Sequence, residues 1–208
     1  MFDVSEFGVP QKRKRIIIVA FRNKVFDNAN KKVAEFYRNL NSYKVSEINT
    51  AGNALSSLPK IHPKETVERK KSHYIDDTGF NSQITDHEPR FHNERDIEIF
   101  QLLAKDIESG DCKYTSSKAL LELYTEKTGK TSSVHKYHVI RGNLPSNIHP
   151  DPEQARSITV REAARLQSFP DDFIFCGANG AKYKMIGNAV PPQFAKHIAR
   201  SLASTLSK

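Results

Sequence analysis

The feature that most constrains the fold is a run of six apolar residues at 16–21, with the sequence IIIVAF. A continuous, largely β-branched run is typical of a strand buried on both faces at the centre of an α/β sheet. No other run of this kind occurs in the sequence. A strand that requires neighbours on both sides, in a chain without other obvious strands, predicts an incomplete sheet.

Length and composition exclude several classes of protein. The 208 residues allow one domain or two small ones, and the apolar content of 38% is low for a globular domain. The run at 16–21 is much shorter than the roughly 20 apolar residues that span a bilayer. The N-terminal sequence MFDVSE lacks the basic and apolar regions of a signal peptide. We therefore exclude the membrane and secreted classes.

Charge and cysteine content favour a cytoplasmic protein that binds a polyanion. The chain has 32 Lys and Arg against 24 Asp and Glu, a net charge of +8. Six of the first 25 residues are basic and two are acidic, so nucleic acid is the leading class of partner. Cys112 and Cys176 form no Cys-x-x-Cys pair and cannot build a disulfide scaffold, which favours a reducing compartment.

Apolar spacing predicts two helices in the middle of the chain. The first covers 96–108, with Gly110 as its stop signal. The second covers 117–127, with Gly129 as its cap.

The C-terminal part carries the strongest helix signals. Thr159 and Glu162 form a capping box for a helix that continues to Ser168. A last helix begins at the Pro191-Pro192 pair, since proline is tolerated in a first helical turn. Its predicted apolar face consists of Phe194, Ile198 and Leu202.

Gln11, Arg13 and Arg15 are the first candidate site. Alternate residues of a strand share a face, so these side chains project together while Lys12 and Lys14 point the other way. An amide and two guanidiniums suit phosphate oxygens or the carbonyl edge of a base. The alternative is that the basic residues guard an aggregation-prone strand or form a localisation signal.

Gly187-Asn188 is the second candidate site. A glycine-containing turn before a helix exposes backbone N–H groups that suit a carboxylate or phosphate. The alternative is an ordinary loop with an asparagine cap. No metal is expected, because two pairs of closely spaced histidines lack a third ligand at a sensible spacing. These pairs are His135 with His138, and His87 with His92.

Three segments together resemble the cytosine-C5 DNA methyltransferases. FGVPQKRKR at 7–15 resembles motif VIII of that family, RSITVREAARLQSFPDDF at 156–173 resembles motif IX, and YKMIGNAVPP at 183–192 resembles motif X. The motifs stand in the family's order around a variable middle. Together the three segments contain 37 residues.

The resemblance implies an α/β fold. We expect part of a Rossmann-like S-adenosylmethionine-dependent methyltransferase fold, namely one sheet strand and the C-terminal helix, plus a mixed α+β target-recognition domain. The implied boundaries are a catalytic-domain strand with motif VIII at 1–24 and the recognition domain at 25–155. Residues 156–208 return to the catalytic domain with motifs IX and X.

The resemblance also implies an activity and roles for residues. Enzymes of the family flip a cytosine out of double-stranded DNA, attack its C6 with a cysteine thiolate and methylate C5 from S-adenosylmethionine. Arg15 would hold the flipped base, with Gln11 and Arg13 supporting base and backbone. The residues implied for the cofactor are Gly187, Asn188, Ala189 and Val190. Those implied for DNA are Lys136, Tyr137, His138, Arg141, Ser146 and Asn147, whereas Arg161 and Arg165 would be structural.

Departures from the family pattern limit what this chain does alone. The nucleophile of the family belongs to a Pro-Cys dipeptide. In this chain, however, Cys112 follows Asp111 and Cys176 follows Phe175. The glycine-rich cofactor motif and the Glu-Asn-Val motif are also absent. In PSNIHP at 145–150, two segments that a longer recognition loop usually separates are nearly fused, a compression that could remove base contacts.

Three functional hypotheses follow. The first is the C-terminal portion or smaller subunit of a prokaryotic restriction–modification methyltransferase, with motifs I to VI on a partner chain. The second is a non-catalytic DNA-binding remnant. The third is a stand-alone enzyme that uses Cys112 or Cys176.

Overall fold

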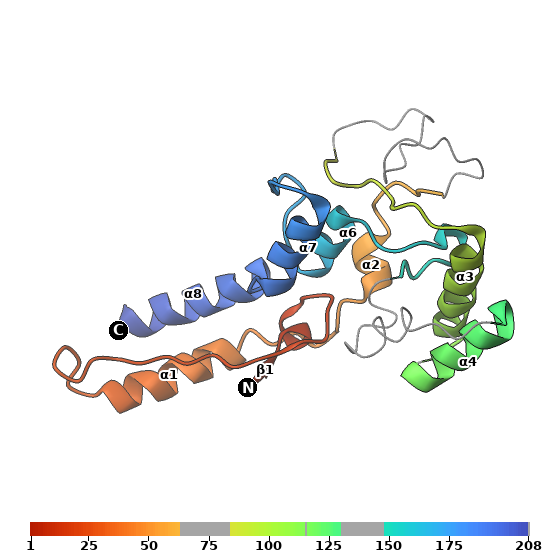
Figure 1. Ribbon diagram of the computed structural model, residues 1–208. Helices are drawn as coiled ribbons and strands as arrows, with labels where there is room; N and C mark the ends of the chain where they lie inside the picture. Colours follow the sequence, from red (N-terminus) through yellow and green to blue (C-terminus); the bar gives the residue numbers. More distant parts are fainter. Residues whose placement is uncertain (63–83, 115, 130–147, 208) are drawn as a thin grey trace. The chain divides into compact units, whose positions relative to one another are not determined.

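A computed structural model describes residues 1–62, 84–114, 116–129 and 148–207 of the chain (Figure 1). Contacts divide the chain into two compact units, one of Met1–Ser57 with Ala163–Lys208 and one of Leu58–Glu162. The described part is a mixed α/β structure with helices and one two-stranded sheet. None of its helices is long and apolar enough to cross a membrane.

The first unit begins with a small antiparallel sheet. In it β1 (Phe2–Asp3) pairs with β2 (Lys14–Arg15), so that Phe2 lies opposite Arg15. The other elements of this unit are η1 (Val4–Phe7), α1 (Ala29–Asn41), α2 (Ala51–Leu55), α7 (Asn179–Asn188) and α8 (Pro192–Leu206). The helix α6 (Val160–Leu166) begins in the second unit and ends in the first.

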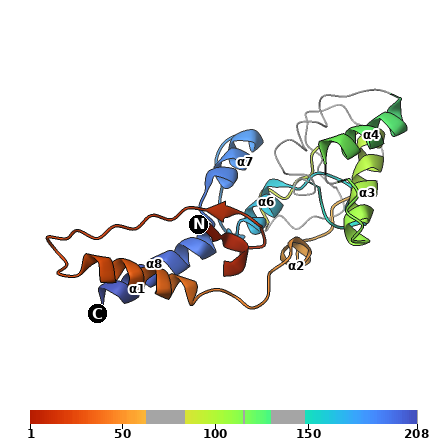
Figure 2. The same cartoon turned by 90° about the horizontal axis from the view of Figure 1, so that it is seen from below.

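The core of the first unit lies between η1, α1 and α8. The two long helices lie side by side and run in opposite directions (Figures 1 and 2). Asn39 Nδ2 donates to Thr205 Oγ1 over 3.1 Å, and Lys32 Nζ donates to the Thr205 carbonyl over 2.6 Å. The buried apolar side chains are Val4, Phe7, Val9, Phe36, Leu40 and Phe194.

Residues 16–21 are covered on one side only, which agrees with the expected incomplete sheet, but they form no strand. Ile17, Val19 and Phe21 pack against the core, whereas Ile16 is 73% exposed and Ile18 86% exposed. The strand β2 ends at Arg15, and no described strand pairs with residues 16–21. Only one side of this segment is covered, because the described part of the chain provides helices for one face and nothing for the other.

The prediction of the apolar face of α8 is also partly wrong. Leu202 is 37% exposed, and Ser201 and Thr205 are fully buried instead. At 100° per residue, position 202 lies about 80° away from Phe194, whereas positions 201 and 205 lie within about 20° of it. The two hydroxyls tolerate burial because Ser201 Oγ donates to the His197 carbonyl and Thr205 Oγ1 to the Ser201 carbonyl.

The second unit confirms both helices predicted in the middle of the chain. They are α3 (Glu94–Glu108) and α4 (Ser117–Thr128), and Gly129 caps α4 with a φ of 66°. A short 3-10 helix, η2 (Pro152–Gln154), and a bridge between Ile148 and Ser157 complete the described elements of this unit. Its apolar core contains Ile99, Leu103, Leu120, Leu123, Tyr124 and Ile148.

The contacts place residues 25–57 with the first unit, although we assigned them to a recognition domain from the sequence. Helix α1 packs against α8 and contributes Phe36 and Leu40 to the core described above. The functional boundaries at 24 and 155 stay predictions.

Candidate functional site

Residues 11–15 alternate in exposure as the sequence predicts. Gln11, Arg13 and Arg15 are half-buried, whereas Lys12 and Lys14 are exposed. The three predicted donors therefore share one face of the segment. Their roles toward DNA stay predictions.

The turn before this segment depends on Gly8. Its φ of 81° is in the left-handed region, where glycine is favoured over other residues. A Cβ at this position would lie 2.5 Å from Gln193 Nε2, which donates to the Phe7 carbonyl over 3.2 Å. Gly8 thus lets the chain turn closely against the first turn of α8.

The three donor side chains have different surroundings. Arg13 Nη2 donates to the Gly187 carbonyl, so the structure brings the two sequence-predicted sites together. Among the described residues, Arg15 Nη1 donates to the neighbouring Lys14 carbonyl alone, over 2.8 Å. Gln11 Oε1 is buried and has no hydrogen-bond partner among the described residues.

A pocket of about 450 Å³ lies beside Gln11. Its lining includes Asp3, Glu6 and Lys12. Glu6 is paired with Lys44 at 2.7 Å, and Asp3 Oδ1 accepts from the backbone N–H groups of two residues. Because two carboxylates line this pocket, it does not suit a phosphate group.

The expected turn at Gly187-Asn188 is wrong, because these residues form the end of α7. The helix ends there since Pro191 and Pro192 cannot continue it, and Ala189 is extended at ψ 153°. Asn188 is exposed and Val190 is 47% exposed. A Cβ at Gly187 would meet nothing within 4 Å, so the backbone at Gly187 borders open space.

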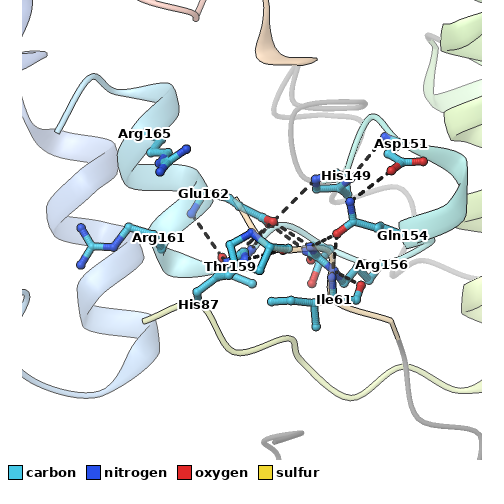
Figure 3. A network of polar contacts seen from close by, with 12 residues as sticks. Ile61, His87, His149, Asp151, Gln154, Arg156, Thr159, Arg161, Glu162 and Arg165 are labelled. Atoms are coloured by element: carbon cyan, nitrogen blue, oxygen red, sulfur yellow. Dashed lines mark hydrogen bonds and ion pairs between the residues drawn. The ribbon is translucent and has the colours of Figure 1, made fainter. Parts of the chain in front are cut away.

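The second unit contains a buried polar network around Glu162 (Figure 3). Arg156 and Glu162 are both 0% exposed and form a bidentate ion pair with distances of 2.7 and 2.8 Å. Arg156 also donates to the Ile61 carbonyl over 3.1 Å and to Gln154 Oε1 over 2.8 Å. The predicted capping box is confirmed, because Glu162 Oε2 accepts from Thr159 N and Thr159 Oγ1 from Glu162 N.

Two histidines complete this network. His87 Nε2 lies 3.0 Å from the Pro59 carbonyl, so it carries the proton, and Nδ1 lies 3.0 Å from Thr159 Oγ1. His149 Nδ1 accepts from Asp151 N, and its Nε2 lies 3.6 Å from Glu162 Oε1. His87 therefore contacts a hydroxyl and a carbonyl. The described part of the chain holds no group of three or more His, Cys, Asp and Glu residues placed to bind a metal ion.

Burial and the neighbouring charges shift two pKa values in this network. Burial lowers the pKa of His149, and the Arg156 charge acts in the same direction against the opposing Glu162 charge. Burial alone would raise the pKa of Glu162, but the hydrogen bonds and charge of Arg156 outweigh it and hold that pKa below its ordinary value.

These shifts predict that the chain loses stability in acid in two steps. Because the folded state disfavours protonated His149, its contribution is complete above the ordinary pKa of 6.5 and is lost as the pH falls from there through the lowered value. Glu162 adds a second loss as the pH falls below 4.5. Urea midpoints measured from pH 8 to pH 4 should fall accordingly, and His149→Gln should weaken the first step. Burial also lowers the pKa of His197, so a smaller first loss of stability should remain in the His149→Gln variant. Equal midpoints at pH 7.5 and pH 5 would contradict this prediction.

Arg161 and Arg165 are both held by protein groups. Arg161 is fully buried, and it donates to Thr85 through Nε at 2.9 Å and through Nη2 at 2.7 Å. Within the first unit, Arg165 forms a bidentate pair with Asp171 and donates to Ser57 Oγ over 2.7 Å. These contacts favour structural roles.

The other candidates divide into two groups. Cys112 and Cys176 are exposed and form no disulfide. The histidine pair at 135 and 138 and all six predicted DNA contacts lie outside the described residues. The latter are Lys136, Tyr137, His138, Arg141, Ser146 and Asn147.

The roles of Arg156, His87 and His149 were not predicted from the sequence. Arg156 stands three residues before Thr159 of the capping box, and this proximity was the available signal. Nothing local identifies the histidines, because His87 contacts Thr159 across 72 positions.

Comparisons with known proteins agree on one family. The model of the family C-5 cytosine-specific DNA methylase matches residues 1–204 of this chain. Type II methyltransferase M.Bpa9945I of Bacillus paralicheniformis is 32% identical over 100% of this chain and 51% of its own length. Type II methyltransferase M1.HphI of Haemophilus parahaemolyticus is 29% identical over 97% of this chain and 46% of its own length.

A plant relative extends the match beyond prokaryotes. DNA (cytosine-5)-methyltransferase 2 of Arabidopsis thaliana is 29% identical over 99% of this chain and 17% of its own length. The chain spans about half the length of the Bacillus and Haemophilus enzymes named above. No solved structure matches it. On the match over residues 1–204, the chain belongs to the C-5 cytosine-specific DNA methylase family.

Proposed function

We propose that this chain is the C-terminal part of a DNA (cytosine-5-)-methyltransferase that transfers methyl from S-adenosylmethionine to cytosine in duplex DNA. It supplies DNA contacts and one wall of the cofactor pocket. The remaining sheet strands and the nucleophile come from an N-terminal part carrying motifs I to VI. The Type II names of its relatives support a place in restriction–modification.

The open backbone of residues 16–21 carries this proposal. Within the described ranges, its one hydrogen bond joins Tyr37 Oη to the Ile17 carbonyl over 3.0 Å. Peptide groups left without partners are costly once buried, and an unpaired strand edge favours pairing with another strand. Together with the exposed Ile16 and Ile18, these groups fit insertion into a sheet that the N-terminal part completes.

Residues 187–190 fit one side of a cofactor pocket. The C-5 DNA methylases use S-adenosylmethionine, which supplies the methyl group when bound. The exposed Asn188 amide can donate to a carboxylate, and Val190 offers apolar surface. The open space at Gly187 lets a small ligand approach the backbone. This side is open, so the other walls come from the complementary part.

The chemistry requires a thiolate that this chain does not supply. Neither Cys112 nor Cys176 follows a proline, as the family's nucleophile does. In the described ranges the Arg15 guanidinium contacts no other element, and we assign this residue to the flipped base.

Transfer of tritiated methyl from S-adenosylmethionine to DNA tests this proposal. We expect no transfer by the chain alone and transfer by the chain with its N-terminal complement. The Cys112→Ser, Cys176→Ser double variant should be as active as the wild type in the complex, because neither thiol takes part. Activity of the chain alone would overturn this proposal. An inactive complex that binds DNA would favour the non-catalytic DNA-binding alternative.

A further inference from the structure

The Arg13 side chain ends on α7. Its Nη2 donates to the carbonyl of Gly187, in the last turn of that helix. This turn contains no basic residue of its own. The last carbonyls of a helix lack intrahelical partners and carry partial negative charge, so a cation is favourable there. Arg13 supplies that cation from a segment 174 positions away.

The backbone of Arg13 is fixed from two sides. Its N–H donates to Asp3 Oδ1 over 3.1 Å, and its carbonyl accepts from Val4 N over 2.9 Å. With its backbone fixed and its guanidinium on a carbonyl, Arg13 forms a brace between residues 11–15 and the end of α7. The alternation along the strand cannot reveal this, because it gives Arg13 and Arg15 the same face.

Arg15 provides the contrast. Its guanidinium donates to the adjacent Lys14 carbonyl, and among the described residues it joins no second element. The two arginines have the same charge and lie on the same face of one segment, but their hydrogen-bond partners differ. We therefore assign them different functions.

We infer that Arg13 is a positioning residue that holds the backbone of residues 187–190 for S-adenosylmethionine, rather than a contact to the DNA backbone. The inference rests on the proposed function, in which residues 187–190 form a wall of the cofactor pocket. Phosphate and base contacts of this face then fall to Arg15.

Hydrogen exchange of the 208-residue chain tests the brace directly. The amide of Ala189 donates to the Met185 and Ile186 carbonyls, and this geometry depends on the end of α7. Arg13→Ala should speed exchange at 186–190 severalfold, since one charged hydrogen bond is lost. Arg15→Ala, the matched control, should leave exchange there unchanged. Equal exchange in the wild type and Arg13→Ala would overturn the brace.

Ligand binding to the complete enzyme tests the consequence. Calorimetry with S-adenosylmethionine should show about tenfold weaker binding for Arg13→Ala, the loss expected for one hydrogen bond to a charged group. Its affinity for duplex DNA and the salt dependence of that affinity should not change. Arg15→Ala should do the reverse. Arg13→Lys should restore cofactor affinity, because an ammonium can still donate to the Gly187 carbonyl.

Two results would overturn the inference. One is weaker DNA binding by Arg13→Ala with a smaller salt dependence and unchanged cofactor affinity, which identifies a phosphate contact. The other is an equal loss of both affinities with a lower melting temperature, which identifies a general structural role. A wild-type complex that binds neither ligand would refute the proposed function instead, and the exchange result would still decide the brace.

Discussion

Arg156→Met is expected to destabilise the chain by about 3–5 kcal/mol, because it leaves the buried Glu162 carboxylate without its counter-charge. Both side chains are 0% exposed, and their two hydrogen bonds measure 2.7 and 2.8 Å. Arg156 also satisfies the Ile61 carbonyl and Gln154 Oε1, which would lose a donor in the same substitution. Urea unfolding followed by far-ultraviolet circular dichroism measures this loss.

Arg165→Met is the matched control for that substitution. Arg165 also forms a bidentate ion pair, but the side chain of its partner Asp171 is 44% exposed. We expect a loss of about 1 kcal/mol or less, since solvent screens a pair of this kind.

A second experiment removes the charge of Glu162, the partner of Arg156. In a Glu162→Gln background, Arg156→Met should cost less than in the wild type, because glutamine can still cap Thr159 but leaves no buried charge. If Arg156→Met and Arg165→Met destabilise the chain equally, the buried pair does not have the role assigned to it.

The predictable part of the fold is the part encoded locally. The apolar spacing and the caps identified α3 and α4, down to Gly129 at the end of α4. The capping box of Thr159 and Glu162 was equally local. Helix α7 was missed because Ile186 is its single buried residue, so no apolar periodicity marks it.

The site was predictable in its residue types but not in its pairings. Alternation placed Gln11, Arg13 and Arg15 on one face, yet it could not show that Arg13 ends on Gly187. For the same reason it could not place His87 against Thr159. Such contacts join positions far apart in the sequence and depend on packing that no short pattern encodes.

Residues 16–21 show how an apolar pattern can differ from the burial that this chain alone provides. The sequence IIIVAF is suited to a strand covered on both faces, but the described structure covers only the face of Ile17, Val19 and Phe21. The pattern therefore describes the complete enzyme that we propose. The exposed Ile16 and Ile18 mark where the missing neighbours would pack.

Ile18→Lys should leave the chain intact and prevent its assembly into the active enzyme. Ile18 is 86% exposed, so in the chain alone the change in unfolding free energy should stay within about 0.5 kcal/mol. In the complete sheet the ammonium would be buried without a partner, so binding to the complementary part should weaken about a hundredfold or more.

Co-purification with the complementary part and methyl transfer at limiting concentration measure the effect of Ile18→Lys on assembly. The matched control is Val25→Lys, because Val25 is also β-branched and is 64% exposed but lies outside the run. Val25→Lys should assemble normally. Ile17→Lys should instead unfold the chain, since Ile17 packs on the core that contains Phe36 and Phe194. Normal assembly and activity of Ile18→Lys would show that residues 16–21 do not enter a shared sheet, and the observation that carries the proposed function would then need another explanation.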